Sequence, residues 1–281
     1  MKGEEAKSDE RPISTLRWSL IGLFAVATTF YILYTNPIVF TLLPGIYASL
    51  VFVIAGLYGI ERYGFKNTVI FFLITWIVSL FFEAFSIQTG FPLSYHYNLA
   101  SPIVLFQVPL IVIFAYFGMG YVCWTLSHVL TGQYSNKLEG RWIFIVPFIA
   151  ALIMVMWDLI MDPIASTVLS QWVWHNPGAY FGVPITNFFT WFVTVFIFYQ
   201  LFALYLAKYD WIQPQKMKTL SSKSFWIQAS VVYGLVGLYP ILVSVPIHND
   251  ITVSMSLVTV FTMIFVALIS FITIMNNDHL R

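Results

Sequence analysis

The stretch WIFIVPFIAALIMVMWDLIMDP, residues 142–163, decides the fold class because it is apolar over a length that can cross a membrane. A helix that spans the hydrocarbon core needs about 20 mostly apolar residues. The stretch ends with two carboxylates, Asp158 and Asp162, which are four residues apart and therefore lie on one face of a helix. We expect a transmembrane helix that holds a pair of acids near one margin of the membrane.

The composition of the whole chain is typical of a membrane protein. Of its 281 residues, 59% are hydrophobic and 9% are charged, whereas a soluble domain carries about 25% charged residues. The net charge of +1 gives no indication of nucleic-acid binding, so no nucleic-acid partner is expected. The single cysteine, Cys123, allows no internal disulfide.

Eight apolar runs in the sequence are long enough to be spans. They predict an all-α polytopic membrane helix bundle of about eight transmembrane helices, forming a single integral membrane domain over residues 17–281. Residues 1–16 are polar and mixed in charge, and we expect them to form a disordered cytoplasmic tail. The expected spans are residues 18–36, 38–60, 67–83, 103–130, 142–161, 187–207, 224–246 and 252–275.

The basic residues predict how the bundle is oriented. Cytoplasmic loops of membrane proteins carry an excess of Lys and Arg. With eight spans, all 13 Lys and Arg fall on one side: before the first run, after the second, fourth and sixth runs, and at the C-terminus. We therefore expect both termini in the cytoplasm and a multi-pass protein of the cell membrane.

The opposite side of the expected bundle has no Lys or Arg, yet it collects unusual polar residues. Two long connections, residues 84–102 and 162–186, are rich in aromatic residues and contain no basic residue. We expect them to fold back over the helix ends. The polar residues expected on this side are Glu83, His96, Asp158, Asp162, His175, Asn187, His248 and Asp250.

The three carboxylates Glu83, Asp158 and Asp162 are the strongest functional signal. An ionisable group in a membrane span is costly and marks a functional site by default. Two close carboxylates that lack a basic partner cannot both ionise easily, so one should hold a proton near neutral pH. The other features have ordinary explanations. The aromatic residues could be interfacial anchors, Asn187 could cap a helix, and Asp162 could simply end its span before Pro163.

This cluster suits acid-catalysed chemistry on an apolar polyene. A neutral carboxylic acid beside an ionised one can serve as acid and base in one site, and aromatic faces can stabilise a cation. Protonation of an electron-rich double bond would give a tertiary carbocation. Capture of this cation by water is hydration, and capture by another double bond of the substrate is cyclisation.

Other enzyme classes fit the sequence less well. A prenyltransferase would need a second aspartate cluster and basic residues for diphosphate, and a di-iron enzyme would need paired histidines; the expected site has neither. The chain has no phosphate-binding glycine loop and no nucleophile elbow. We therefore expect chemistry without a cofactor or a metal.

Two segments resemble the carotenoid biosynthesis protein family of archaea and bacteria. The first is Glu83 with Thr89-Gly90-Phe91-Pro92 and Tyr95-x-Tyr97. The second is Asp158, Asp162-Pro163, Trp172-x-Trp174, Gly178-x-Tyr180-x-Gly182-x-Pro184, Asn187 and Trp191.

The resemblance implies a carotenoid hydratase, a hydro-lyase that adds water to the terminal double bond of an acyclic carotenoid end group. The substrate would be of the bisanhydrobacterioruberin or lycopene type, and the product would carry a tertiary hydroxyl. It also implies a lipid-soluble substrate and contact with membrane lipid. Because a water-insoluble intermediate favours hand-over within the membrane, other membrane enzymes of the pathway are expected partners. The chain departs from the family at one place that bears on end-group specificity. After the proline of the first segment, Pro92, the family usually has Phe-Gly, and this chain has Leu93-Ser94.

The roles of individual residues follow from charge and placement. We expect Asp158, the deeper acid, to protonate the alkene, and Asp162 with Glu83 and either His96 or Asn187 to position and deprotonate water. Two alternatives stay open: a carotenoid cyclase or isomerase with the same acid, and a proton-coupled transporter. The residues expected to bind the substrate are Tyr95, His96, Tyr97, Trp172, Trp174, Tyr180, Asn187 and Trp191.

Overall fold

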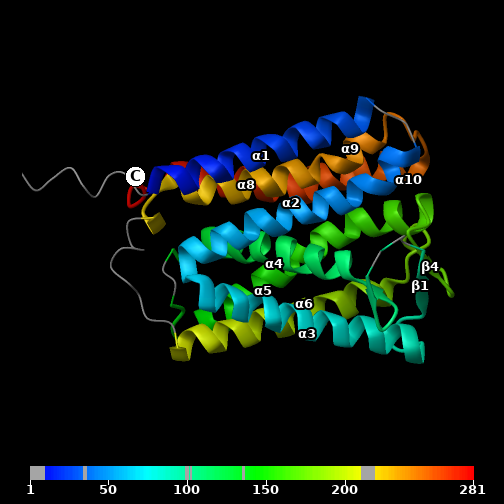
Figure 1. Cartoon of the computed structure of the whole chain (residues 1–281), viewed down its shortest axis with the longest axis horizontal. Helices are drawn as coiled ribbons and strands as arrows, with labels where there is room; N and C mark the ends of the chain where they lie inside the picture. Colours follow the sequence, from blue (N-terminus) through cyan, green and yellow to red (C-terminus); the bar gives the residue numbers. More distant parts are fainter. Residues whose placement is uncertain (1–9, 34–36, 99–100, 102, 135–136, 210–218) are drawn as a thin grey trace, which may run out of the picture.

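The structure, a computed structural model of the chain, describes residues 10–33, 37–98, 101, 103–134, 137–209 and 219–281. Within these residues, eight helical segments are long and apolar enough to cross a membrane. They lie side by side along the long axis of the molecule (Figure 1). The predicted all-α polytopic bundle is therefore confirmed.

The helices have the following bounds. The α-helices are α1 (Glu10–Leu33), α2 (Pro37–Tyr63), α3 (Phe65–Thr89), α4 (Leu110–Leu130), α5 (Trp142–Asp162), α6 (Ile185–Tyr209), α8 (Lys223–Gly237), α9 (Tyr239–Val243), α10 (Asp250–Thr259) and α11 (Phe265–Met275). The π-helical segment η2 (Pro163–Val168) extends α5, and η3 (Val260–Ile264) joins α10 to α11.

Helix α4 forms the centre of the bundle. All of its residues from Tyr116 to Val129 are buried, and it packs against α2, α3, α5 and α8. Gly118 lets α4 approach α2 closely, because a Cβ at this position would come within 3.0 Å of the Phe52 backbone nitrogen. Small residues allow such close helix contacts in membranes, where packing rather than the hydrophobic effect drives association.

Several spans end at different residues from those expected, and two differences matter for the acids. Helix α3 continues six residues past Glu83 to Thr89, where Gly90 in the left-handed conformation ends it. Asp162 is the last α-helical residue of α5, but Pro163 does not stop the span, because the chain continues as π-helix to Val168. A π-turn accommodates a residue that cannot donate a backbone hydrogen bond. All three carboxylates thus lie inside spans and not at their ends.

The other differences lie at span termini. Helix α1 begins at Glu10, within the stretch expected to be a tail, and residues 1–9 of that stretch lie outside the described residues. Residues 103–109, expected to open the fourth span, instead carry the short antiparallel strands β2 (Val104–Leu105) and β3 (Val108–Pro109). The expected seventh span is divided into α8 and α9 around Leu238.

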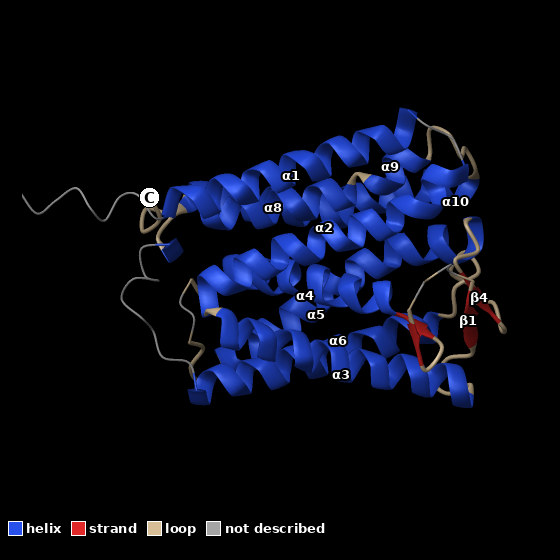
Figure 2. Cartoon of the chain, in the orientation of Figure 1, coloured by secondary structure: helices blue, strands red, loops and turns tan. Residues whose placement is uncertain are grey.

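The two long connections fold over one end of the bundle, as expected. Strand β1 (Tyr95–Tyr97) from the first pairs antiparallel with β4 (Trp172–Trp174) from the second, with Tyr95 opposite Trp174. Figure 2 shows this small sheet beside the ends of the helices, at the end of the bundle opposite to the C-terminus. We call residues 90–98, 103–109 and 169–184 the cap.

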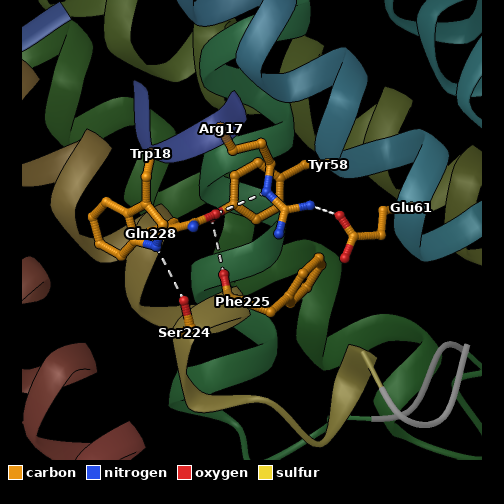
Figure 3. Close-up of polar contacts among 7 residues, drawn as sticks. All are labelled: Arg17, Trp18, Tyr58, Glu61, Ser224, Phe225 and Gln228. Carbon is orange, nitrogen blue, oxygen red and sulfur yellow. Dashed lines mark hydrogen bonds and ion pairs between the residues drawn. The ribbon is translucent and has the colours of Figure 1, made fainter. Parts of the chain in front are cut away.

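The opposite end of the bundle, where α1 begins and the chain terminates, is held by a buried polar cluster (Figure 3). Arg17 of α1 forms an ion pair with Glu61 of α2, and its Nε donates a hydrogen bond to Gln228 Oε1 of α8 at 2.8 Å. The guanidinium also lies over the rings of Tyr58 and Phe225. We call these five residues the Arg17 cluster; it joins three helices.

Candidate active site

Glu83 lies at the centre of the first half of the site. It is 6% exposed, and tyrosine hydroxyls from two elements donate to both of its oxygens. Tyr95 and Tyr97 of β1 donate to Oε2, the latter at 2.9 Å, and Tyr116 of α4 donates to Oε1 at 2.6 Å. Because alternate residues of a strand point to the same side, one face of β1 supplies two donors and ties the cap to α3.

The two strand tyrosines remain hydrogen-bond donors over a wide pH range. Burial, and next the negative charge of Glu83, raise the pKa of Tyr95 well above its ordinary value of 10.0. The same two causes raise the pKa of Tyr97 well above that value. Both hydroxyls therefore stay protonated, and can donate to Glu83, beyond the pH at which an ordinary tyrosine ionises.

The second half of the site is the aspartate pair on α5. Asp158 and Asp162 are 1% and 2% exposed. The amide of Asn187, on the first turn of α6, donates to Asp158 Oδ2 at 2.9 Å and to Asp162 Oδ2 at 2.7 Å. The indole of Trp172 in β4 donates to Asp162 Oδ1 at 2.9 Å. One amide thus bridges the two carboxylates, and the cap reaches the pair as it reaches Glu83.

Both halves border one cavity of about 420 Å³. At the cap it is polar and aromatic, and it extends into the bundle between α2, α4, α5 and α8. Cavities of this size bind ligands through apolar walls and a few placed polar groups. The apolar residues that line it include Val51, Val112, Met119, Val236 and Met263.

An aromatic wall flanks the carboxylates. The ring of Trp191 stacks on Tyr116 with a centroid distance of 4.7 Å and meets the edge of Trp157 at 5.8 Å. Trp172 and Trp174 line the cavity from the cap. The arrangement places aromatic side chains and carboxylates around the same space, which suits a transient cation.

The structure brings most of the residues expected in the site to this cavity. Two of them lie elsewhere. The Tyr180 hydroxyl donates to the Leu159 backbone oxygen at 3.1 Å, which fixes the cap to α5. His96 is exposed, and its Nδ1 lies 2.9 Å from His175 Nε2. The expected residues that line the cavity are Glu83, Tyr95, Tyr97, Asp158, Asp162, Trp172, Trp174, Asn187 and Trp191.

Sequence reasoning missed two residues of the site, Tyr116 and Trp157. Tyr116 lies in the middle of an apolar run, 33 residues from the Glu83 that it contacts, so no local spacing connects the two. Trp157 directly precedes Asp158, and its position next to a membrane carboxylate was the available signal. Among the described residues, no group of three or more His, Cys, Asp or Glu side chains could hold a metal ion.

The chain belongs to the carotenoid biosynthesis protein family. Its residues 40–263 match that family, which is well over half of the 281 residues. The resemblance seen in the two sequence segments is therefore confirmed. No curated protein and no solved structure matches the chain. The protein is thus a membrane protein of carotenoid biosynthesis, with a buried cluster of carboxylates at one end of its bundle.

Proposed function

We propose that this protein is a carotenoid hydratase of the cell membrane, which adds water to the terminal double bond of an acyclic carotenoid end group of the bisanhydrobacterioruberin or lycopene type. One observation carries the proposal: three buried carboxylates and an aromatic wall border one largely apolar cavity, and no described Lys or Arg lines it. Acids without a basic partner supply protons, and the cavity walls accept a hydrocarbon.

The aspartate pair supplies the acid. Two carboxylates in this position cannot both ionise easily, so the pair holds one proton, and the Asn187 amide keeps both groups aligned. Asp158 gives its proton to the less substituted carbon of the double bond. The π electrons form the new C–H bond, and the positive charge develops on the tertiary carbon.

Water completes the reaction. Its oxygen bonds to the tertiary carbon, and one of its protons passes to the ionised Asp162. The pair begins and ends with one proton, which returns to Asp158 before the next turnover. The product is the substrate plus one water, so the chemistry needs no redox partner and no cofactor.

The surroundings of the pair favour the cationic intermediate. The side chains of Trp157, Trp172 and Trp191 line the cavity, and the Glu83 carboxylate adds a negative charge. The three tyrosine donors hold that carboxylate in place. A preorganised environment of this kind stabilises charge that develops in the transition state.

The cavity also accounts for substrate access. A cavity of about 420 Å³ accommodates an end group, and the rest of the polyene extends towards membrane lipid. If both termini are cytoplasmic, the site lies at the outer margin of the membrane, where water is available. Other membrane enzymes of carotenoid synthesis would supply the substrate and take the product.

A product assay tests the proposal. The protein is expressed in one host that accumulates lycopene and in another that accumulates bisanhydrobacterioruberin, and the pigments are weighed by mass spectrometry. We expect a pigment heavier by one or two waters. It should be absent with Asp158→Asn and present with Asp250→Asn, which changes an exposed aspartate at the start of α10. An isomer of unchanged mass would indicate cyclisation instead, and no new pigment with either substrate would contradict the proposal.

A further inference from the structure

The cavity that holds the carboxylates reaches across the bundle. At one side it is lined by Glu83 and Ser86 of α3, and at the other by Tyr239 and Pro240 of α9. Figure 1 shows α3 and α9 on opposite sides of the bundle, with α2 and α4 between them. The proposed reaction takes place next to α3, α5 and the cap, so the part of the cavity towards α9 has no role in the chemistry.

This second part of the cavity differs from the first in polarity. It is lined by residues of α2, α8, α9 and η3, among them Val51, Val236 and Met263. None of the described lining residues from these four elements is charged, and only Tyr47 and Tyr239 carry a hydroxyl. We call the part of the cavity that these four elements line the apolar side. One cavity thus joins a side with three carboxylates to a side with hydrocarbon walls.

Tyr47 lines the apolar side without offering a free proton to a substrate. Its hydroxyl donates to Thr28 Oγ1 of α1, because the Thr28 hydroxyl itself donates to the Phe24 backbone oxygen at 2.8 Å. The Tyr47 ring lies between α1 and α9, with centroid distances of 4.4 Å to Phe24 and 6.5 Å to Tyr239. The residue is therefore part of an aromatic wall and not a second acid.

The chemistry of a terminal double bond indicates what occupies the apolar side. Beyond the bond that Asp158 protonates, an acyclic end group has only two methyl groups, whereas the rest of the substrate is a long conjugated chain. The apolar side is lined from four elements and is larger than two methyl groups require. We infer that it binds the conjugated chain that follows the end group, while the reacting bond lies at the carboxylates. This inference rests on the proposed function and names the chain-binding part of the same site.

Ala48 of α2 is the position at which the width of the apolar side is tested. Lipid tails are as apolar as the cavity walls, so a hydrocarbon gains its binding energy there from close packing. Ala48 is half-buried and lines the cavity, and Ala48→Phe places a ring where the wild type has a methyl group. Ser49→Phe is the matched control, because Ser49 is the next residue of α2, is exposed and does not line the cavity.

The experiment measures how hydration depends on the length of the substrate. The substrates are the carotenoid that the protein hydrates, lycopene or bisanhydrobacterioruberin, and a series of polyenes that keep one of its end groups and are shortened from the other end. Each is supplied at a range of mole fractions in lipid vesicles that contain the purified protein. Hydrated product, measured by mass spectrometry, gives KM and kcat. Where a shortened polyene is not hydrated, its inhibition of carotenoid hydration gives the same comparison.

We expect Ala48→Phe to raise KM for the full-length carotenoid about ten-fold, the effect of overfilling a packed site, with a smaller change in kcat. The difference from wild type should disappear for the shortest polyenes, whose chains end before the apolar side. Ser49→Phe should follow wild type at every length. An unchanged KM in Ala48→Phe would overturn the inference. An equal rise at every length would also overturn it, because the apolar side would then hold the end group.

Failure of the proposed function gives a different result. A wild-type protein that hydrates neither carotenoid would refute the hydratase proposal, whereas failure of the inference leaves hydration intact in wild type and in Ser49→Phe. If Ala48→Phe does not accumulate in membranes, Val236→Phe narrows the same side of the cavity from α8. The same expected and contrary results apply to that variant.

Discussion

The bundle buries polar clusters at both ends, and the two clusters manage charge in opposite ways. In the Arg17 cluster, the cation and the anion neutralise each other, and Gln228 accepts from the guanidinium. At the cap, three carboxylates lie together without a cation among the described residues near them, and their partners are neutral hydroxyl, amide and indole donors. None of the five residues of the Arg17 cluster lines the cavity, whereas all three carboxylates do.

The Arg17 cluster holds helices together, whereas the three carboxylates are reactive groups kept in an energetically unfavourable state. A paired charge in a dry environment is stable while both partners are present. Unpaired acids of like charge cost stability and are kept where function requires them. The two ends should therefore respond in opposite ways to substitution: one in stability, the other in turnover.

The largest effect is expected for Asp158→Asn. Without its proton donor the site cannot form the cation, and turnover should fall by a factor of about 10³, the scale of general acid catalysis. Stability should be unchanged or higher, because the substitution removes one of two close carboxylates. Hydrated pigment per amount of protein and thermal unfolding in detergent measure both quantities. Near-normal turnover would show that Asp158 is not the acid.

Breaking the Arg17 cluster should give the opposite pattern. Glu61→Gln leaves a buried guanidinium without its anion, which costs about 3 kcal/mol of the free energy of unfolding. Turnover per folded molecule should not change, because none of the cluster's residues lines the cavity. Unfolding in detergent and the pigment assay on the same preparation test this.

A double variant separates charge from packing in that cluster. Arg17→Met with Glu61→Leu replaces both charges by apolar side chains, and should recover most of the stability lost in Glu61→Gln. A double variant as unstable as the single one would show that the ion pair itself, and not the unpaired charge, decides stability.

The sequence was sufficient to predict those parts of the structure that depend on residues close together in the chain. Apolar length alone predicted eight spans, and a four-residue spacing alone placed Asp158 and Asp162 on one helix face. The end of the third span was predicted too early, at Glu83, because a carboxylate was taken as a boundary. Glycine was the better signal, since the helix ends at Gly90.

The remaining parts of the site depend on contacts between distant segments. Tyr95 and Trp174 become neighbours only through the pairing of β1 with β4, and no spacing in the sequence predicts that pairing. Once β1 is known, alternation explains why Tyr95 and Tyr97 face Glu83 while His96 points away. The residue types of the site and the end of the bundle where they lie were predicted from the sequence, but the contacts between these residues were not.

Tyr116 tests the part of the site that the sequence did not reveal. Tyr116→Phe removes the donor to Glu83 Oε1, and a hydrogen bond to a charged group contributes about 1.5–3 kcal/mol. We expect turnover to fall about ten-fold. The matched control is Tyr121→Phe on the same helix, because the Tyr121 hydroxyl is buried, has no partner among the described residues and does not line the cavity. Equal effects of the two substitutions would remove Tyr116 from the site.

The smallest effect is expected at alkaline pH, where the tyrosines that the cap supplies to Glu83 ionise in the unfolded chain before they ionise in the folded protein. Burial and the charge of Glu83 raise the pKa of Tyr95 and Tyr97 above 10.0 in the folded protein. Their contribution to stability is thus fully present below the unfolded pKa of about 10, and is lost as pH rises through the higher folded pKa.

Unfolding in detergent between about pH 8 and pH 11 measures this loss. In Tyr97→Phe, the decline of stability above pH 10 should be shallower than in wild type, by at most about 1.4 kcal/mol per pH unit. Tyr209→Phe changes an exposed tyrosine, the last residue of α6, which does not line the cavity, and should follow wild type. Equal slopes for wild type and Tyr97→Phe would mean that burial beside Glu83 does not raise the pKa of Tyr97. The contrast between the two ends would then rest on the aspartate pair alone.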